Sequence, residues 1–265
     1  MSELRSGDAR LFYEVSGNGP SVVLLHPFPL NHRFWTAIAA QLSSRYRLVV
    51  PDLRAHGASE MGEGPATMQK LSEDLAQICR EEKTGKAILV GVSIGGYLLF
   101  EFWRRYRDQV AALVLANTRA GAETPESKAV RLQAADKVRR EGTAGFIDEM
   151  LSRLFSPATR SNRPDIVDAA RKMMQAMSPE DVAGVQRGIA ERPDSIATLA
   201  TINVPTLLIA GDEDSVPLSE FELMRQGIAG SELRVISRAG HYAALEKPEE
   251  FGGLLRGFLD RQPRQ

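Results

Sequence analysis

Short apolar segments alternate with helical patterns along most of this chain. Several of these segments are apolar almost throughout, which is typical of parallel strands buried on both faces of a sheet. Strands that alternate with helices predict an α/β fold with a mostly parallel central sheet flanked by helices. The predicted strands are residues 10–15, 22–25, 48–50, 87–90, 113–115, 206–209 and 233–236.

Helical patterns fill most of the gaps between these strands. Asn31 is a suitable N-cap for the first helix, and Pro248 is a good first residue for the last one. Two more helices are predicted at residues 67–83 and 93–107.

The alternation stops between Asn117 and about residue 192, where only helical segments occur. These segments are residues 126–140, 144–155, 165–177 and 179–190. They follow the carboxyl end of a strand, and α/β proteins bind ligands at that edge of the sheet. The sequence therefore predicts a core at 1–118, a helical cap or lid at 119–192, and a return to the core at 193–265.

Charge and cysteine content exclude several classes of protein. The formal net charge is -1, so no overall field attracts nucleic acid or an anionic membrane. The one cysteine, Cys79, cannot form an internal disulfide, and its helical pattern predicts a buried, inert thiol. No apolar run reaches the roughly 20 residues of a membrane span, and the N-terminus lacks a secretory pattern. The sequence predicts a cytoplasmic protein with a small-molecule substrate; a homo-oligomer is compatible with it.

The segment Gly91-Val92-Ser93-Ile94-Gly95 matches the pattern G-x-S-x-G between a strand and a helix. Glycines allow a tight turn there that exposes the serine hydroxyl, and the helix N-terminus behind it favours negative charge. The alternative is a glycine-rich turn in which Ser93 only caps the helix. The setting favours Ser93 as a nucleophile.

A serine nucleophile needs a base and an acid, and both candidates follow strands. His241 lies between the last predicted strand and the final helix. Asp212, Glu213 and Asp214 all follow the strand at 206–209. Spacing favours Asp214, because Asp212 is better placed for the turn itself. The order serine, aspartate, histidine is that of an α/β-hydrolase triad.

Two backbone amides are candidates for an oxyanion hole. Pro27 and Pro29 have no N–H, so Phe28 is the donor expected after the early strand. Ile94, directly after the serine, is the second donor. We interpret His26 as a structural residue held by hydrogen bonds.

These motifs together resemble the α/β-hydrolase superfamily over nearly the whole chain. They are His26-Pro27-Phe28-Pro29, residues 52–59, residues 91–95, residues 211–217 and Gly240-His241. The resemblance implies the acid at the end of G-x-x-D, which supports Asp214, although Pro27 replaces the glycine usual in the early motif. The chain looks most like 3-oxoadipate enol-lactonases and small carboxylesterases. The pair 28–29 is also similar to cofactor-free haloperoxidases, which are perhydrolases.

Three further side chains are candidates for substrate contact. Arg119 follows the strand that ends near Asn117 and could meet a substrate carboxylate; Arg54 is a second candidate, and Trp35 a third. Surface or bracing roles for the arginines and core packing for the tryptophan are the alternatives. The scattered histidines and single cysteine form no metal pattern, so no metal or cofactor is expected.

The sequence thus predicts a serine esterase or lactonase with Ser93, Asp214 and His241 as its catalytic triad. Three alternatives remain open. A perhydrolase would use the same acyl-enzyme with peroxide, and a C–C bond hydrolase would need a ketonic substrate. A binding protein on a hydrolase scaffold would keep the pocket without turnover.

Overall fold

Eight strands form one sheet in the computed structural model, which describes residues 2–263. Their order across the sheet is β1-β2-β4-β3-β5-β6-β7-β8. The pairs β1/β2 and β2/β4 are antiparallel and every other neighbouring pair is parallel, so the predicted mostly parallel sheet is confirmed. The strands are β1 (Ser2–Ser6), β2 (Ala9–Ser16), β3 (Ser21–Leu25), β4 (Arg47–Pro51), β5 (Ala87–Val92), β6 (Val110–Ala116), β7 (Thr206–Gly211) and β8 (Glu232–Ile236).

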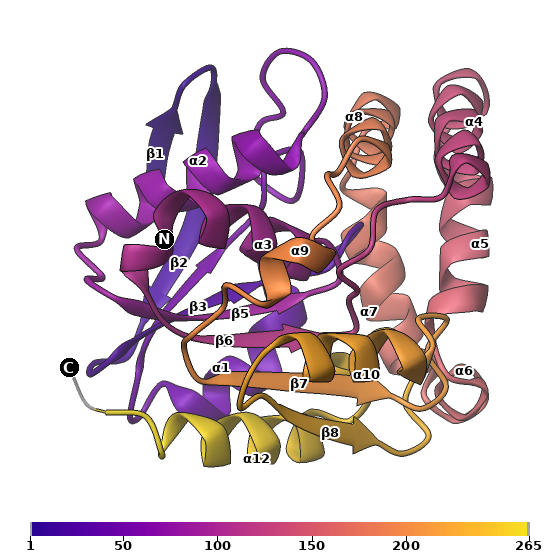
Figure 1. The fold of residues 1–265 in the computed structure, drawn as a ribbon. Helices are drawn as coiled ribbons and strands as arrows, with labels where there is room; N and C mark the ends of the chain where they lie inside the picture. Colours follow the sequence, from indigo (N-terminus) through magenta and orange to yellow (C-terminus); the bar gives the residue numbers. More distant parts are fainter. Residues whose placement is uncertain (1, 264–265) are drawn as a thin grey trace.

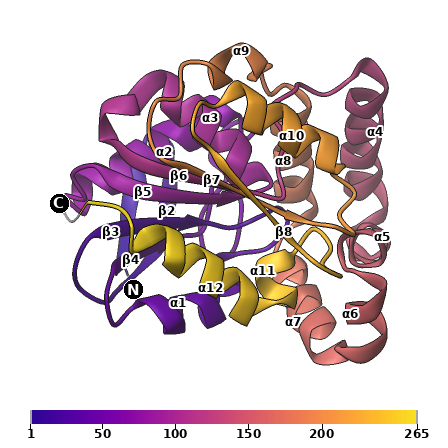
Figure 2. The same cartoon turned by 60° about the horizontal axis from the view of Figure 1, so that its bottom comes forward.

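Helices cover both faces of the sheet (Figures 1 and 2). On one face, α1 (Thr36–Leu42) packs beside α12 (Pro248–Leu259); on the other, α2 (Met68–Glu81) packs beside α3 (Ile94–Tyr106). The shorter helices of the core are η1 (His32–Trp35), η2 (Arg107–Gln109), α9 (Ile196–Leu199), α10 (Leu218–Gly227) and α11 (Ala243–Glu246). Every residue of β5 and β7 is buried, because these strands are covered on both sides.

Side chains at the helix starts explain where several of these elements begin. The Thr67 hydroxyl accepts the Lys70 amide and starts α2. The Asn31 side chain accepts the Arg33 amide, so the predicted cap is confirmed, although it opens the short helix η1 and not α1 directly. Pro248 occupies the first turn of α12, where its missing N–H costs nothing.

Six helices lie between β6 and β7: the short helix α9 and five others, which stand beyond the carboxyl ends of the strands (Figure 1). Within this cap, α4 packs against α8 and α5 against α7. The predicted helical insertion is confirmed. Its exact division from the core, at 119 and 192, stays a prediction, and residues 1, 264 and 265 of the predicted core lie outside the described residues. The cap helices are α4 (Pro125–Glu141), α5 (Ala144–Leu154), α6 (Pro157–Asn162), α7 (Pro164–Gln175) and α8 (Pro179–Ala190).

Backbone contacts tie the cap to the core at two places. Helix α8 lies directly on the segment before α2: the Ala66 amide donates to the Gly184 carbonyl at 3.3 Å. A Cβ atom on Gly188 would lie 2.0 Å from the Ala66 oxygen, so only glycine fits there. At the other end, the carbonyl of Leu154 in α5 accepts the amide of His241 at 2.8 Å.

Cys79 is buried in α2, and burial raises the pKa of its thiol to about 11. The prediction of a buried thiol is therefore confirmed. Across residues 2–263 the structure has no helix with the length and apolar character needed to cross a membrane.

Candidate active site

Ser93 occupies a strained turn between β5 and α3. Its φ of 54° and ψ of -113° lie outside the regions that L-residues favour. The two motif glycines make this turn sterically feasible. A Cβ atom on Gly91 would lie 2.5 Å from the backbone of Gly95, and one on Gly95 would lie 2.8 Å from the Leu25 oxygen. The sequence therefore forms the elbow that the motif predicts, with the serine at its tip.

Asp214 and His241 form a close carboxylate–imidazole pair. The Nδ1 atom of His241 lies 2.8 Å from Asp214 Oδ1 and 3.0 Å from Oδ2. Burial raises the pKa of the Asp214 carboxyl, but the His241 ring and its other hydrogen bonds outweigh burial and lower it below 3.8. An ionised carboxylate accepts a hydrogen bond from the Nδ1–H group of the imidazole. The proton therefore stays on Nδ1, and Nε2 is the nitrogen that can take up another proton.

Ser93 and His241 line the same cavity of about 340 Å³. Both residues are largely buried, with 9% and 6% of their surface exposed. Within residues 2–263, no hydrogen bond joins the Ser93 hydroxyl to the imidazole. Contacts of this kind commonly tighten only when substrate binds.

Sequence reasoning missed Asn117, which holds the acidic member of this pair. Its side-chain nitrogen donates to Asp214 Oδ2 at 2.9 Å and to the carbonyl of Gly240 at 3.3 Å. The residue is fully buried and has a φ of 44°, a conformation that asparagine tolerates better than most residues. A polar residue at the end of the apolar strand β6 was the signal available in the sequence.

Asp212, the other aspartate after β7, serves the turn as predicted. Its carboxylate accepts the Arg238 amide at 2.6 Å and the Ser237 hydroxyl at 3.1 Å. These bonds join the end of β7 to the loop after β8.

The amides of Phe28 and Ile94 are both free to bind an anion. Neither donates to an acceptor within residues 2–263, and Ile94 is the first residue of α3. The side chain of Phe28 lines the cavity beside Ser93. Each amide therefore has a hydrogen-bond donor that the described part of the chain does not use.

His26 is structural, as interpreted from the sequence. Its Nδ1 donates to the Pro27 carbonyl at 3.0 Å, and its Nε2 accepts the Leu53 amide at 2.9 Å. Complete burial lowers the pKa of its imidazole to about 3, so the ring stays neutral. It braces the loop that carries Phe28.

Two of the three candidate substrate contacts do not reach this cavity. Arg54 is buried and paired with Asp8 at 2.6 Å and Asp74 at 2.7 Å, so it braces the core. Trp35 is fully buried against Phe34 and Phe251. The structure therefore does not bring these two predicted contacts to the cavity, because Arg54 is held in ion pairs and Trp35 in aromatic packing.

Arg119 does line the cavity, beside a buried carboxylate that the sequence analysis did not single out. Its Nη2 lies 3.1 Å from Glu123, which also meets Arg131 at 3.1 Å and Arg192 at 3.3 Å. The remaining lining is mostly apolar and includes Phe28, Phe146, Met150, Leu154, Ile189 and Val216.

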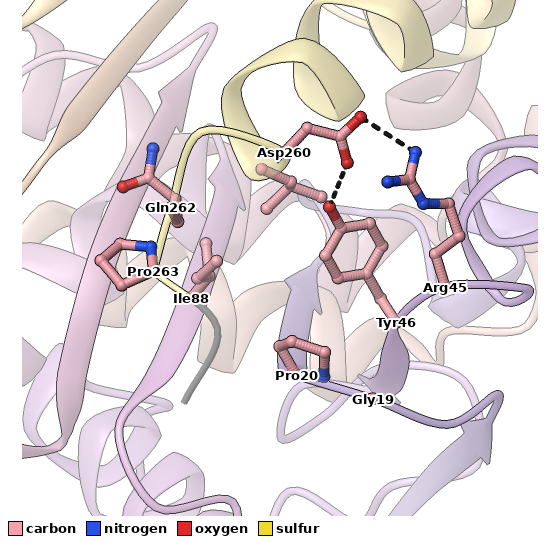
Figure 3. Close-up of a pocket in the computed structure, with 9 residues that line it drawn as sticks. Gly19, Pro20, Arg45, Tyr46, Ile88, Asp260, Gln262 and Pro263 are labelled. Atoms are coloured by element: carbon pink, nitrogen blue, oxygen red, sulfur yellow. Dashed lines mark hydrogen bonds and ion pairs between the residues drawn. The ribbon is translucent and has the colours of Figure 1, made fainter.

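No group of three or more histidine, cysteine or acidic side chains within residues 2–263 is arranged to hold a metal. A second large cavity lies near the C-terminal end of the chain and contains no comparable chemistry (Figure 3). Within residues 2–263, the carboxylate in its lining is that of Asp260, which accepts a hydrogen bond from the Tyr46 hydroxyl at 2.6 Å and pairs with Arg45 at 3.0 Å. The cavity with Ser93 is thus the candidate active site.

Known proteins are similar to this chain in sequence and in architecture. The profile of the alpha/beta hydrolase family matches residues 22–253. The chain belongs to the alpha/beta hydrolase family. It is 29% identical over 252 residues to 3-oxoadipate enol-lactonase 1 of Acinetobacter baylyi, covering 94% of this chain and 92% of the relative.

Solved structures of alpha/beta hydrolases agree with this assignment. An esterase from Thermogutta terrifontis superposes with a TM-score of 0.95 at 38% identity, over 98% of this chain and 99% of that one. A bromoperoxidase from Bacillus anthracis superposes with a TM-score of 0.86 at 24% identity, over 95% and 96%, and shares the fold. The resemblance inferred from the motifs is confirmed.

Proposed function

We propose that this alpha/beta hydrolase cleaves carboxylic esters or lactones through an acyl-enzyme on Ser93. One observation carries the proposal: the 2.8 Å pair between Asp214 and His241 borders the cavity that the Ser93 elbow also lines. The relatives add support, because their names describe an enol-lactonase and an esterase, both of which cleave an ester bond.

In the proposed reaction, His241 Nε2 takes the proton of the Ser93 hydroxyl as its oxygen attacks the substrate carbonyl. The carbonyl oxygen becomes negative and accepts hydrogen bonds from the backbone amides of Phe28 and Ile94. His241 then gives the proton to the leaving alkoxide, and the acyl group stays on Ser93. Water, activated by the same imidazole, releases the acid and restores the serine. Asp214 keeps the imidazole in the correct tautomer and stabilises its charged form.

The cap, taken as residues 119–192, is proposed to close the acyl-binding side of the cavity. Helices α4, α5 and α8 contribute lining residues, among them Arg131, Met150 and Ile189. Excluding water on this side strengthens the electrostatic interactions with the reacting carbonyl.

Labelling with a fluorophosphonate tests the nucleophile. We expect the wild type to label and the Ser93→Ala variant not to. Ser127→Ala is a matched control, since this hydroxyl lines the same cavity but bonds to Glu123, and it should label normally. A panel of p-nitrophenyl esters and lactones then tests turnover, with a burst of p-nitrophenol expected for an acyl-enzyme.

Other outcomes would point to the alternatives. If the folded wild type does not label, binding without turnover is favoured and the proposal fails. Bromide oxidation with peroxide in acetate buffer would identify a perhydrolase. Turnover of a ketonic substrate, without turnover of any ester, would identify a C–C bond hydrolase.

A further inference from the structure

The cavity beside Ser93 contains one buried carboxylate surrounded by three guanidinium groups. Glu123 has 1% of its side chain exposed and is shared by Arg119, Arg131 and Arg192. Burial raises the pKa of Glu123, but the three arginines and the Ser127 hydroxyl lower it to about 2. One negative charge therefore balances only one of three positive charges.

Arg192 does not line the cavity and is held by neighbouring groups of the protein. Only 2% of its side chain is exposed, and its guanidinium lies 4.2 Å from the ring centroid of Tyr97. It also donates to the carbonyl of Gly121. The two other arginines line the cavity and keep 28% and 24% of their side chains exposed.

Arg119 retains donors that no protein group accepts. Its hydrogen bonds to Glu123 use Nη2 alone. Its Nη1 makes no hydrogen bond within residues 2–263, and 28% of the side chain, which lines the cavity, is exposed. A guanidinium N–H that is not used by the protein binds an anionic oxygen more strongly than a neutral acceptor.

The rest of the lining does not cancel this charge. Arg153 of α5 lines the cavity, and its one hydrogen bond within the described residues is a 3.5 Å contact to the sulfur of Met150. Glu149, on the same helix, is the second glutamate of the lining and is exposed. Arg192 pairs with Glu123 but does not line the cavity. When it is included, the group contains four arginines and two glutamates.

We infer that the cavity selects esters or lactones that carry a carboxylate group, and that Arg119, supported by Arg131, binds this carboxylate. The inference rests on the proposed function of Ser93, because it places the anionic group on the substrate of that same serine. Glu123 holds the arginines in place, and the Nη1 of Arg119 supplies the open donor. The substrate class is a half-ester of a dicarboxylic acid or a lactone bearing a carboxylate.

Two substrates of equal chain length separate charge from shape. Mono-p-nitrophenyl glutarate has a free carboxylate, and p-nitrophenyl valerate has a methyl group in its place. After spontaneous hydrolysis is subtracted, we expect the wild type to prefer the glutarate half-ester at least tenfold in kcat/KM. This preference should weaken as salt is added, because salt screens the partly exposed guanidinium groups.

Arg119→Gln should lower kcat/KM for the half-ester about tenfold to a hundredfold more than for the valerate ester, the range expected for hydrogen bonds to a charged group. Arg119→Lys should lose less, because it keeps the charge. Arg163→Gln is the matched control: it removes one cap charge from an arginine that is 51% exposed and outside the cavity. It should leave both rates unchanged.

A measurement on the wild type covers the case in which Arg119→Gln does not fold. Glutarate should inhibit valerate ester hydrolysis at a concentration at least tenfold lower than its neutral diamide, glutaramide. Equal inhibition by both, or equal rates on both esters, would overturn the inference and leave the proposed function standing. Failure of the wild type to label and to cleave either ester would overturn both.

Discussion

Asn117 links the two halves of the proposed acid–base pair. Its amide donates to the carboxylate of Asp214 and to the carbonyl of Gly240, the residue before His241. One side chain thus fixes both the acid and the loop that carries the base. Its left-handed backbone conformation points the side chain toward them from the end of β6.

We expect Asn117→Ala to lower kcat about tenfold to a hundredfold with little change in KM. The variant loses the hydrogen bond from Asn117 to the Asp214 carboxylate, and a hydrogen bond to a charged group is worth about 1.5–3 kcal/mol. This bond positions His241 through Asp214 and does not touch the substrate. The rate of fluorophosphonate labelling should fall by the same factor. Asn162→Ala, on the exposed end of α6, is the control and should match the wild type. A rise in KM alone would contradict the positioning role.

Arg54 illustrates a buried ion pair that stabilises the fold. Replacing it with methionine leaves Asp74, 6% exposed, without its partner. We expect Arg54→Met to lower the free energy of unfolding by about 3–5 kcal/mol in urea titrations. Arg10→Met should have a much smaller effect, because Arg10 is 51% exposed in its pairs with Glu3 and Glu60 and solvent screens these pairs. Similar losses for the two variants would contradict this assignment.

Residue positions were predictable from the sequence where they depend on chain order, and not where they depend on distant partners. Ser93, Asp214 and His241 follow strands in a recognisable order, so their convergence on one edge of the sheet could be expected. Arg54 and Trp35 also lie in early segments of the chain. The sequence around them does not reveal that Arg54 pairs with Asp8 and Asp74 in the fold. It also does not reveal that Trp35 packs against Phe251.

At the level of elements, α8 is fixed to the core by close backbone contact. Gly188 faces the carbonyl of Ala66, just before α2, at a separation that excludes a methyl group. A glycine in a helix interior normally costs stability, so its use here follows from packing.

Gly188→Ala should therefore destabilise the protein and loosen the junction between cap and core. The added methyl group meets backbone at 2.0 Å, and an overpacked contact of this kind costs about 1–3 kcal/mol. Gly145→Ala in α5 has no atom within 4 Å of the new Cβ. It should be neutral or stabilising by up to about 1 kcal/mol. Thermal unfolding of both variants tests the contrast, and equal effects would contradict it.

The elements missed from the sequence are short and weakly patterned. Strand β1 is five residues long and half exposed, and its sequence SELRS contains too few apolar residues to predict a strand. It exists because it pairs with β2 in the antiparallel direction. Helix α6 has six residues with one buried side chain, which leaves no periodic stripe to detect. The long elements with a full apolar stripe or run, such as α2 and β5, were all predictable.

At the scale of the whole molecule, stability depends on pH through buried carboxylates such as Glu123. The pKa of Glu123 is lowered to about 2 in the folded protein from an ordinary value of 4.5. Its stabilising contribution is therefore complete above pH 4.5, because the unfolded carboxyl is also ionised there. It is lost progressively as pH falls from 4.5 toward 2.

The Glu123→Gln variant tests this dependence. We expect it to be less stable than the wild type by a constant amount between pH 7 and about 5. Below pH 4.5 the difference in free energy of unfolding between the two proteins should shrink. The reason is that the Glu123 carboxyl becomes protonated in the unfolded wild type, so its ionisation in the folded state contributes less to stability. Urea unfolding of both proteins at several pH values measures it. A difference that stays constant down to pH 3 would contradict the lowered pKa.

The bond from the His241 amide to the carbonyl of Leu154 has a consequence for motion of the cap. If α5 swung outward, it would remove the acceptor that anchors this backbone, and the imidazole would lose one of its restraints. Opening would then change reactivity as well as access. By reciprocity, contacts that hold the backbone of His241 also favour the position of α5 seen here.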